Sequence, residues 1–261
     1  MKLLIQECKQ NKKSFLIWAI CLLLINVGCI LLYKTLEDSI QGIAETYSNM
    51  GAMSAAIGMD KLNLATVEGY YGSEIAMMFN LGGALYAALL GIGLLSKEES
   101  GHTAEFLHTL PISRTAIYLW KYIAAFLLII VFNLINIAGN LLSLNYVGDF
   151  TMSHVLLYHV AAFLMQIEIM TITFCISAFN KQIQTGAGLG LAILFFAADM
   201  MSRILPDLEK CKYITPFYYC SAADIFTEGK LDPVLLSIGM CITVLCLIIG
   251  GIQYNRKDLS A

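Results

Sequence analysis

Charged residues are scarce in this chain. Asp, Glu, Lys and Arg make up only 13% of its 261 residues, whereas soluble domains carry about 25%. This shortage excludes an ordinary water-facing surface and hence an ordinary soluble domain. The formal net charge of −3 also argues against nucleic acid as a partner, because phosphate backbones are bound by clusters of Lys and Arg.

The sequence also lacks the motifs of an enzyme that works alone. It has no G-x-x-x-x-G-K-[ST] loop, and its one Gly-Lys pair is followed by leucine, so it cannot hold ATP in such a loop. It has neither the G-x-S-x-G hydrolase motif nor a C-x-x-C pair for zinc. His102, Glu105 and His108 superficially resemble metal ligands, but histidines six residues apart diverge by about 120° on a helix. We therefore expect no metal.

What the chain does have is long apolar runs. Hydrophobic residues make up 58% of it, and the mean hydropathy is +0.72. A helix of about 20 residues crosses a hydrocarbon core of about 30 Å, and all but the fifth run, which is short and rich in glycine, reach that length. We predict an all-α membrane protein in which residues 1–261 form one transmembrane domain. The six predicted spans are residues 14–33, 75–96, 122–144, 155–178, 186–201 and 234–252.

The distribution of Lys and Arg predicts the orientation. If the N-terminus is inside, the inner segments carry ten of the 16 Lys and Arg residues. Cytoplasmic loops are enriched in these residues. We therefore predict that both termini face the cytoplasm.

Two longer segments, residues 34–74 and 202–232, are then expected outside. In the first, apolar residues recur every three or four positions from Leu36 onward, which predicts an amphipathic helix at the interface. The second carries an aromatic cluster, which indicates either an interfacial anchor or a short re-entrant element between helices. A disulfide between its two cysteines, Cys211 and Cys220, is one alternative that the sequence does not decide.

Polar residues inside the spans are expected to face the bundle interior. Glu168 lies near the middle of the fourth span, where a charge costs at least about 2.5 kcal/mol. Amides on the third span, and a histidine and a glutamine on the fourth, form two stripes at helical spacing. Such stripes serve either as interhelical hydrogen bonds or as a cargo path. The stripe residues are Asn133, Asn136, Asn140, His159 and Gln166.

The fifth span carries two further signals. Gly186 and Gly190 form a G-x-x-x-G pattern, which lets helices approach closely within one chain or between two chains. Asp199 and Arg203 are four residues apart and should share one helix face. We predict that they form an ion pair.

The connection between the second and third spans has polar residues in a definite order. Residues 103–110 predict a short amphipathic helix lying at the interface, and Pro111 ends it. Ser113 is a good N-cap for a helix that begins at Arg114 and runs into the third span. Such a break can take a push from a soluble partner and pass it to the spans, and we expect it to sit in water.

This connection, KEESGHTAEFLHTLPISR at residues 97–114 followed by Lys121, resembles the signature of ABC-2 type transporter permeases. Residues 64–70, 213–219 and 254–259 resemble the same family. The resemblance implies the membrane subunit of an ATP-driven exporter in the bacterial cell membrane, acting as a homodimer or heterodimer. It also implies two cytoplasmic ATPase subunits that bind ATP and Mg²⁺, while this chain binds no cofactor. The cargo would be a peptide, a drug or a lipid-like molecule.

The resemblance also implies roles for particular parts of the chain. The first, second and fifth spans would line the cargo path at the dimer interface. The connection would contact the ATPase. The residues it assigns to coupling are Glu98, Glu99, Gly101, Glu105, Pro111, Ser113 and Arg114.

Two other functions stay open on the sequence alone. The runner-up is a proton-coupled secondary transporter in which Glu168 and His159 relay protons. The third is an intramembrane enzyme that uses the same two residues, although their spacing gives it no support. Transport that needs a proton gradient and not ATP would favour the runner-up, and a product formed by the chain alone would favour the enzyme.

Overall fold

The computed structural model describes residues 2–48, 51, 54, 58–101, 103 and 111–257. Within these residues every regular element is helical and none is a strand, which confirms the all-α prediction. Six helices are long and apolar enough to cross a membrane. Their elements are α1 (Lys2–Ser48), the continuous run of α3 (Val67–Tyr70), η1 (Tyr71–Ile75) and α4 (Ala76–Gly93), α7 (Arg114–Val147), α8 (Met152–Phe179), α9 (Thr185–Ile204) and α11 (Pro233–Arg256).

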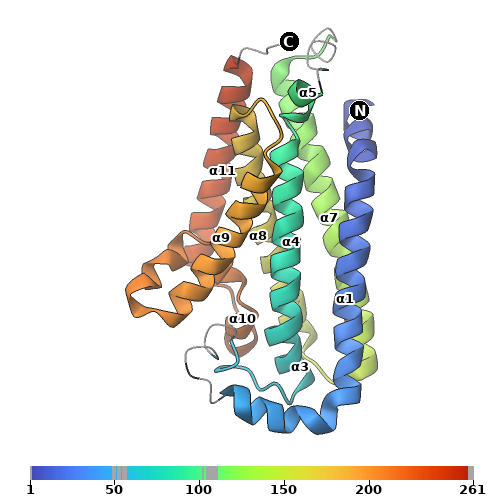
Figure 1. Cartoon of the computed structure of the whole chain (residues 1–261), viewed down its shortest axis with the longest axis vertical. Coiled ribbons are helices and arrows are strands. Elements are labelled where there is room, and N and C mark those ends of the chain that lie inside the picture. The colour runs from blue at the N-terminus through green and yellow to red at the C-terminus, as the bar shows by residue number, and fades with distance from the viewer. Residues whose placement is uncertain are drawn as a thin grey trace.

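The six helices form a bundle with both chain termini at one end (Figure 1). The short helix α5 (Lys97–Ser100) lies at that end, which we call the α5 end. The short helices α3 and α10 (Ala222–Glu228) lie at the opposite end, which we call the α10 end. The two termini lie at the same end because the number of spans is even.

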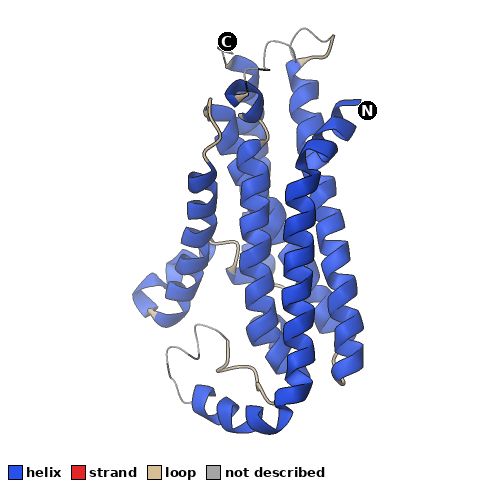
Figure 2. Ribbon diagram, turned by 45° about the vertical axis from the view of Figure 1, so that its right-hand side comes forward, coloured by secondary structure: helices blue, strands red, loops and turns tan. Residues whose placement is uncertain are grey.

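The first helix is longer than its predicted span. It continues to Ser48, and its last part turns sideways across the α10 end (Figures 1 and 2). The amphipathic helix expected after the first span is thus a continuation of α1. There Ile40 packs in a small apolar cluster with Tyr33, Met59 and Leu64.

The second spanning helix starts at Val67, before the predicted residue 75. Thr66 caps it, because its Oγ1 accepts the backbone N–H of Gly69 at 3.0 Å. The early turns contain polar residues, which a hydropathy window excludes. The bundle buries them, and the helix itself satisfies Ser73, which is 1% exposed and donates to the carbonyl of Gly69, one turn before it, at 2.8 Å.

The core of the bundle lies around α4 and α8. In the most apolar window of each of these two spans, 72% of the residues are buried, against 22% to 33% in the other four. The pair is therefore the interior of the protein. α1 packs against α7, α9 packs against α4, and α11 packs against α8, so that these outer helices present their remaining apolar faces outward.

The close approach of α4 to α8 depends on Gly91. A Cβ atom at this position would lie 2.2 Å from Thr173 Oγ1 and 2.3 Å from the backbone oxygen of Met170. Backbone cannot retreat as a flexible side chain can. Small residues at such contacts let spanning helices pack without a hydrophobic driving force between them.

Gly91→Ala should therefore lower the stability of the folded protein by about 1–3 kcal/mol, the usual cost of overpacking. Gly93→Ala is the matched control, because a Cβ at Gly93 meets nothing within 4 Å. Thermal unfolding of the two detergent-purified variants, followed by size-exclusion chromatography, measures the difference. Equal melting temperatures for the two variants would contradict the packing described for α4 and α8.

Candidate functional site

The α5 end contains a network of polar contacts, which begins where α4 stops. The backbone N–H groups of Leu95 and Ser96 both donate to Ser177 Oγ of α8 at 3.1 Å. These donors would otherwise be unpaired at the break between α4 and α5. Because α8 is an interior helix, the start of α5 is attached to the rigid core.

Four charged side chains meet at α5, two from α5 itself and two from spanning helices. Lys121 of α7 donates to Glu7 Oε1 of α1 at 2.9 Å, to the carbonyl of Leu94 at 2.8 Å and to the carboxylate of Glu98. Lys97 donates to the other oxygen of Glu7. We call this set the four-charge cluster; its members are Glu7, Lys97, Glu98 and Lys121.

The cluster is buried and its charges balance. The side chain of Lys121 is fully buried, and that of Glu7 is 2% exposed. Burial lowers the pKa of Lys97, with Lys121 adding to the effect, and burial raises the pKa of Glu98. Removing one member of a buried ion pair leaves an uncompensated charge, at a cost of about 3–5 kcal/mol. The cluster therefore holds α1, α5 and α7 in one arrangement.

The second acid of the pair points to a different helix. Glu99, whose side chain is 4% exposed, forms an ion pair with Lys257 at 2.5 Å. Lys257 also donates to the carbonyl of Asn180, between α8 and α9, at 2.6 Å. Arg114 donates to the carbonyls of Asn255 and Lys257 at 3.3 and 2.8 Å. The end of α11 is thereby fastened both to α5 and to the first turn of α7.

The predicted coupling residues fall into three groups. Ser113 caps α7, since its Oγ accepts the N–H of Ala116 at 3.2 Å, and α7 begins at Arg114 as predicted. Gly101 caps α5, and Pro111 is exposed. Glu98 and Glu99 do not lie on a solvated face, as their place in a polar connection suggested, because spanning helices supply their cationic partners. Glu105 and the expected helix at residues 103–110 lie outside the described residues, apart from position 103.

Sequence reasoning missed two members of this arrangement, Glu7 and Lys257. Glu7 is surrounded in the sequence by lysines, and Lys257 is near the chain end, so neither stands out. One signal could have found Glu7. Lys121 lies at the start of an apolar span, and a lysine entering a span needs a buried partner.

The polar stripes predicted on the third and fourth spans meet each other. Asn133 donates to Gln166 Oε1 at 2.7 Å. Asn140 donates to the hydroxyl of Tyr71 at 3.1 Å, and that hydroxyl also pairs with His159 Nε2 at 2.9 Å. The third asparagine of the stripe, Asn136, donates to the carbonyl four residues before it, at 2.9 Å. The geometry is that of interhelical hydrogen bonding among η1, α7 and α8.

Glu168 and His159 do not form a relay with each other. Nine residues make two and a half helical turns, so the two side chains leave α8 on opposite faces. Glu168 accepts the hydroxyl of Tyr219 at 2.9 Å and lies beside Gly239 of α11, whereas His159 faces Tyr71. Their hydrogen-bond partners are different residues on different helices.

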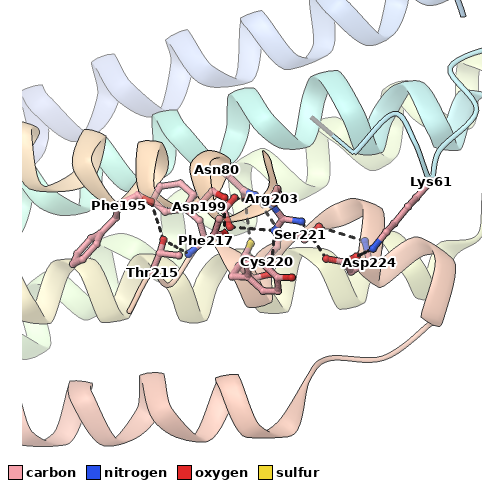
Figure 3. Close-up of polar contacts among 12 residues, drawn as sticks. Lys61, Asn80, Phe195, Asp199, Arg203, Thr215, Phe217, Cys220, Ser221 and Asp224 are labelled. Carbon is pink, nitrogen blue, oxygen red and sulfur yellow. Dashed lines mark hydrogen bonds and ion pairs between the residues drawn. The ribbon is translucent and has the colours of Figure 1, made fainter. Parts of the chain in front are cut away.

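The connection after α9 forms η2 (Pro206–Tyr213), which has no buried residue, and then enters the bundle with η3 (Tyr218–Cys220) and α10. Cys220 is fully buried, and its carbonyl accepts from Asn80 of α4 at 3.1 Å. Thr215 donates to the carbonyl of Phe195 at 2.8 Å (Figure 3). Of the two alternatives, an interfacial anchor or an element between helices, the burial fits the second. Cys211 and Cys220 are free thiols.

The predicted ion pair of Asp199 and Arg203 is confirmed, and it is part of a larger network. The Arg203 guanidinium donates to both oxygens of Asp199 at 3.1 Å and to Asp224 of α10 at 3.3 Å. Lys61, from the segment before α3, reaches the other oxygen of Asp224 at 2.6 Å (Figure 3). The network fastens three separate segments at the α10 end.

This network predicts acid sensitivity. Burial would raise the pKa of Asp224, but the hydrogen bond from Lys61 and the charge of Arg203 hold it below its ordinary 3.8. A carboxylate with a depressed folded pKa stabilises the protein above its unfolded pKa and loses that contribution as the pH falls. As the pH falls below about 4, the melting temperature should therefore decrease. The melting temperature of Asp224→Asn should decrease less over the same range. Asp149→Asn, at an exposed position, should keep the full drop; equal drops in both variants would contradict the prediction.

The glycine pattern on α9 divides between two faces. A Cβ at Gly186 or Gly190 would meet nothing within 4 Å, whereas one at Gly188 would lie 3.0 Å from Ile92 of α4. Close packing inside the chain therefore uses Gly188. The G-x-x-x-G face points away from the described part of the bundle. Among the described residues there is also no cluster of three His, Cys, Asp or Glu that could hold a metal ion.

Comparison with known protein families places the chain among transporter proteins. A protein-family model described as "ABC-2 family transporter protein" matches residues 1–259. No curated protein matches the chain. The matched range includes all six candidate spans and the α5 end, so that the buried charges lie inside one family domain.

Proposed function

This chain belongs to the ABC-2 transporter family, and from that premise we propose that it couples ATP hydrolysis by separate ATPase subunits to export. Membership makes it the membrane component of an ABC transporter, and its six apolar helices make it a multi-pass membrane protein. The proposed cargo is a peptide, a drug or a lipid-like molecule. The proposed location is the bacterial plasma membrane.

The observation that supports coupling is the attachment of α5 to three spanning helices. Glu98 is bonded to Lys121 of α7, which is bonded in turn to Glu7 of α1. Glu99 is bonded to Lys257 at the end of α11. A displacement of α5 must therefore either move these three helix ends or break buried ion pairs. We propose that the ATPase pushes on the segment that follows α5, and that α5 passes the displacement to the bundle.

The orientation follows from the same proposal. The α5 end would face the cytoplasm, where the ATPase subunits bind ATP and Mg²⁺. Both termini lie at this end (Figure 1), in keeping with the excess of Lys and Arg in the segments assigned to the inside. This chain itself would bind no nucleotide.

We further propose that two permease chains, identical or related, act together with two ATPase copies. The outward glycine face of α9 supports a second chain there, since Gly186 and Gly190 have open space beside them. Small residues on an outward face let a second helix approach closely. The first, second and fifth spans would then line the cargo path between the two chains.

Purification of the full-length chain in mild detergent, followed by identification of bound proteins, tests the assembly. We expect an ABC ATPase to co-purify in equal numbers with the permease. Inverted membrane vesicles containing the complex should then take up cargo only with hydrolysable ATP. Transport by the purified chain alone, driven by an ion gradient, would overturn the proposal.

A further inference from the structure

A groove of about 540 Å³ lies between α7 and α11, near the α5 end. Apolar side chains form most of it, among them Leu119, Ile248 and Ile252, which are 45%, 53% and 49% exposed. Exposed aliphatic side chains on spanning helices face lipid when no other helix covers them. The groove is thus open to the membrane on the leaflet that adjoins the α5 end.

The depth of the groove comes from Gly251 and Tyr118. Gly251 has no side chain, and a Cβ there would touch the ring of Tyr118 at 3.4 Å. The Tyr118 hydroxyl is already bonded to the carbonyl of Leu247 at 2.8 Å. The ring therefore forms an apolar floor, and its hydroxyl proton is already donated within the protein. A hydrocarbon chain fits such a surface.

The end of the groove nearest the aqueous boundary is polar and positive. Thr115, Asn255 and Arg256 line it; Arg256 is exposed and has no ion-pair partner among the described residues. None of the lining residues is a carboxylate. Arg114, bonded to the carbonyls of Asn255 and Lys257, adds a second guanidinium beside this end.

We propose that this groove binds an anionic phospholipid. One acyl chain lies along Leu119, Ile248 and Ile252 over the Tyr118 ring, and the phosphate lies at Arg256 and Thr115. Basic pockets between spanning helices favour anionic headgroups for the same electrostatic reason. A lipid, rather than a peptide segment, fits because the apolar part opens into the membrane and the charge lies at one end only.

The position of the groove gives the lipid a structural consequence. Its walls are the first turns of α7 and the last turns of α11, the same two helix ends that Arg114 joins. A bound lipid therefore contacts both sides of that joint. We expect the protein to melt at a higher temperature in membranes that contain the anionic lipid than in membranes without it.

The test uses the full-length chain, with any co-purifying partner, in nanodiscs of phosphatidylcholine with or without phosphatidylglycerol. Lipid retained after extraction into detergent is measured by mass spectrometry, and melting temperatures are measured in both discs. We expect phosphatidylglycerol to be enriched over its share of the disc. Arg256→Gln should lower its retention about fivefold, the loss expected for one basic residue at an anionic surface.

Further variants distinguish binding of the acyl chain from binding of the headgroup. Gly251→Leu fills the apolar part, so it should lower retention of both lipids. Lys181→Gln removes an exposed cation outside the lining and should change nothing, as should Gly28→Leu, where a Cβ has open space. Unchanged retention in Arg256→Gln, or equal loss in Lys181→Gln, overturns the proposal. Because Arg256 is exposed, its variant tests the site even if Gly251→Leu fails to fold.

Discussion

Replacing Lys121 with methionine should destabilise the folded protein by about 3–5 kcal/mol, the cost of leaving a buried charge without its partner. Lys121 is fully buried and serves both Glu7 and Glu98. Without it, two carboxylates share the single cation of Lys97. We expect a much lower melting temperature and a lower yield of monodisperse protein in detergent.

A second substitution should recover much of this loss. In the double variant Glu7→Gln/Lys121→Met the charges of Lys97 and Glu98 balance again, so the double variant should be more stable than Lys121→Met alone. Such a coupling between substitutions is the signature of a direct interaction. Lys181→Met, at an exposed lysine, is the control. A melting temperature for Lys121→Met equal to that of this control would show that the four-charge cluster contributes nothing.

Reversing the charge at Glu99 should reduce ATP-dependent transport at least about tenfold, which requires a loss of only about 1.4 kcal/mol of coupling free energy. Glu99→Lys places two cations together at the contact between α5 and the end of α11, where Lys257 now forms an ion pair. This contact lies outside the apolar core around α4 and α8. We therefore expect ATP hydrolysis by the partner to continue while transport falls, measured side by side in inverted vesicles.

The charge-swapped variant Glu99→Lys/Lys257→Glu supplies the decisive comparison, because it restores opposite charges at the same contact. It should recover transport, and the melting temperatures of the single and swapped variants show whether Glu99→Lys loses transport without losing the fold. Glu209→Lys is the matched control, since Glu209 forms an exposed pair with Lys212 at the other end of the bundle. If the swapped variant stays inactive, or if Glu99→Lys transports normally, this ion pair does not carry the coupling.

The boundaries of the spans show where sequence reasoning stopped. The second helix begins at Val67, earlier than the predicted residue 75, whereas the third begins at Arg114 as its cap predicted, although its apolar run starts only at residue 122. A hydropathy window rejects polar residues because it assumes that they face lipid. Lys121 belongs to its helix because Glu7 of another helix satisfies it, and Ser73 belongs to its helix because it bonds to the carbonyl of Gly69 one turn before it. The cap at Ser113 could be predicted, since capping depends only on neighbours in the chain.

The polar residues of the spans show the same limit in another form. Helical spacing alone placed Asn133, Asn136 and Asn140 in one stripe, and His159 and Gln166 in another. It could not tell whether the two stripes meet, because that depends on how α7 and α8 are rotated against each other. The pairing of Asn133 with Gln166 and the joint contact of Asn140 and His159 with Tyr71 supply the answer.

By itself the sequence determined that this protein has six segments long and apolar enough to cross a membrane, that it contains no G-x-x-x-x-G-K-[ST] loop, and that its informative polar segment lies between the second and third spans. Those properties follow from composition, run length and local spacing, which need no knowledge of distant contacts. Only the tertiary structure decided that Glu98 and Glu99 point inward, to different helices. Their partners are Lys121 of α7 and Lys257 at the end of α11. A buried charge is strongly destabilising unless folding brings an opposite charge to it.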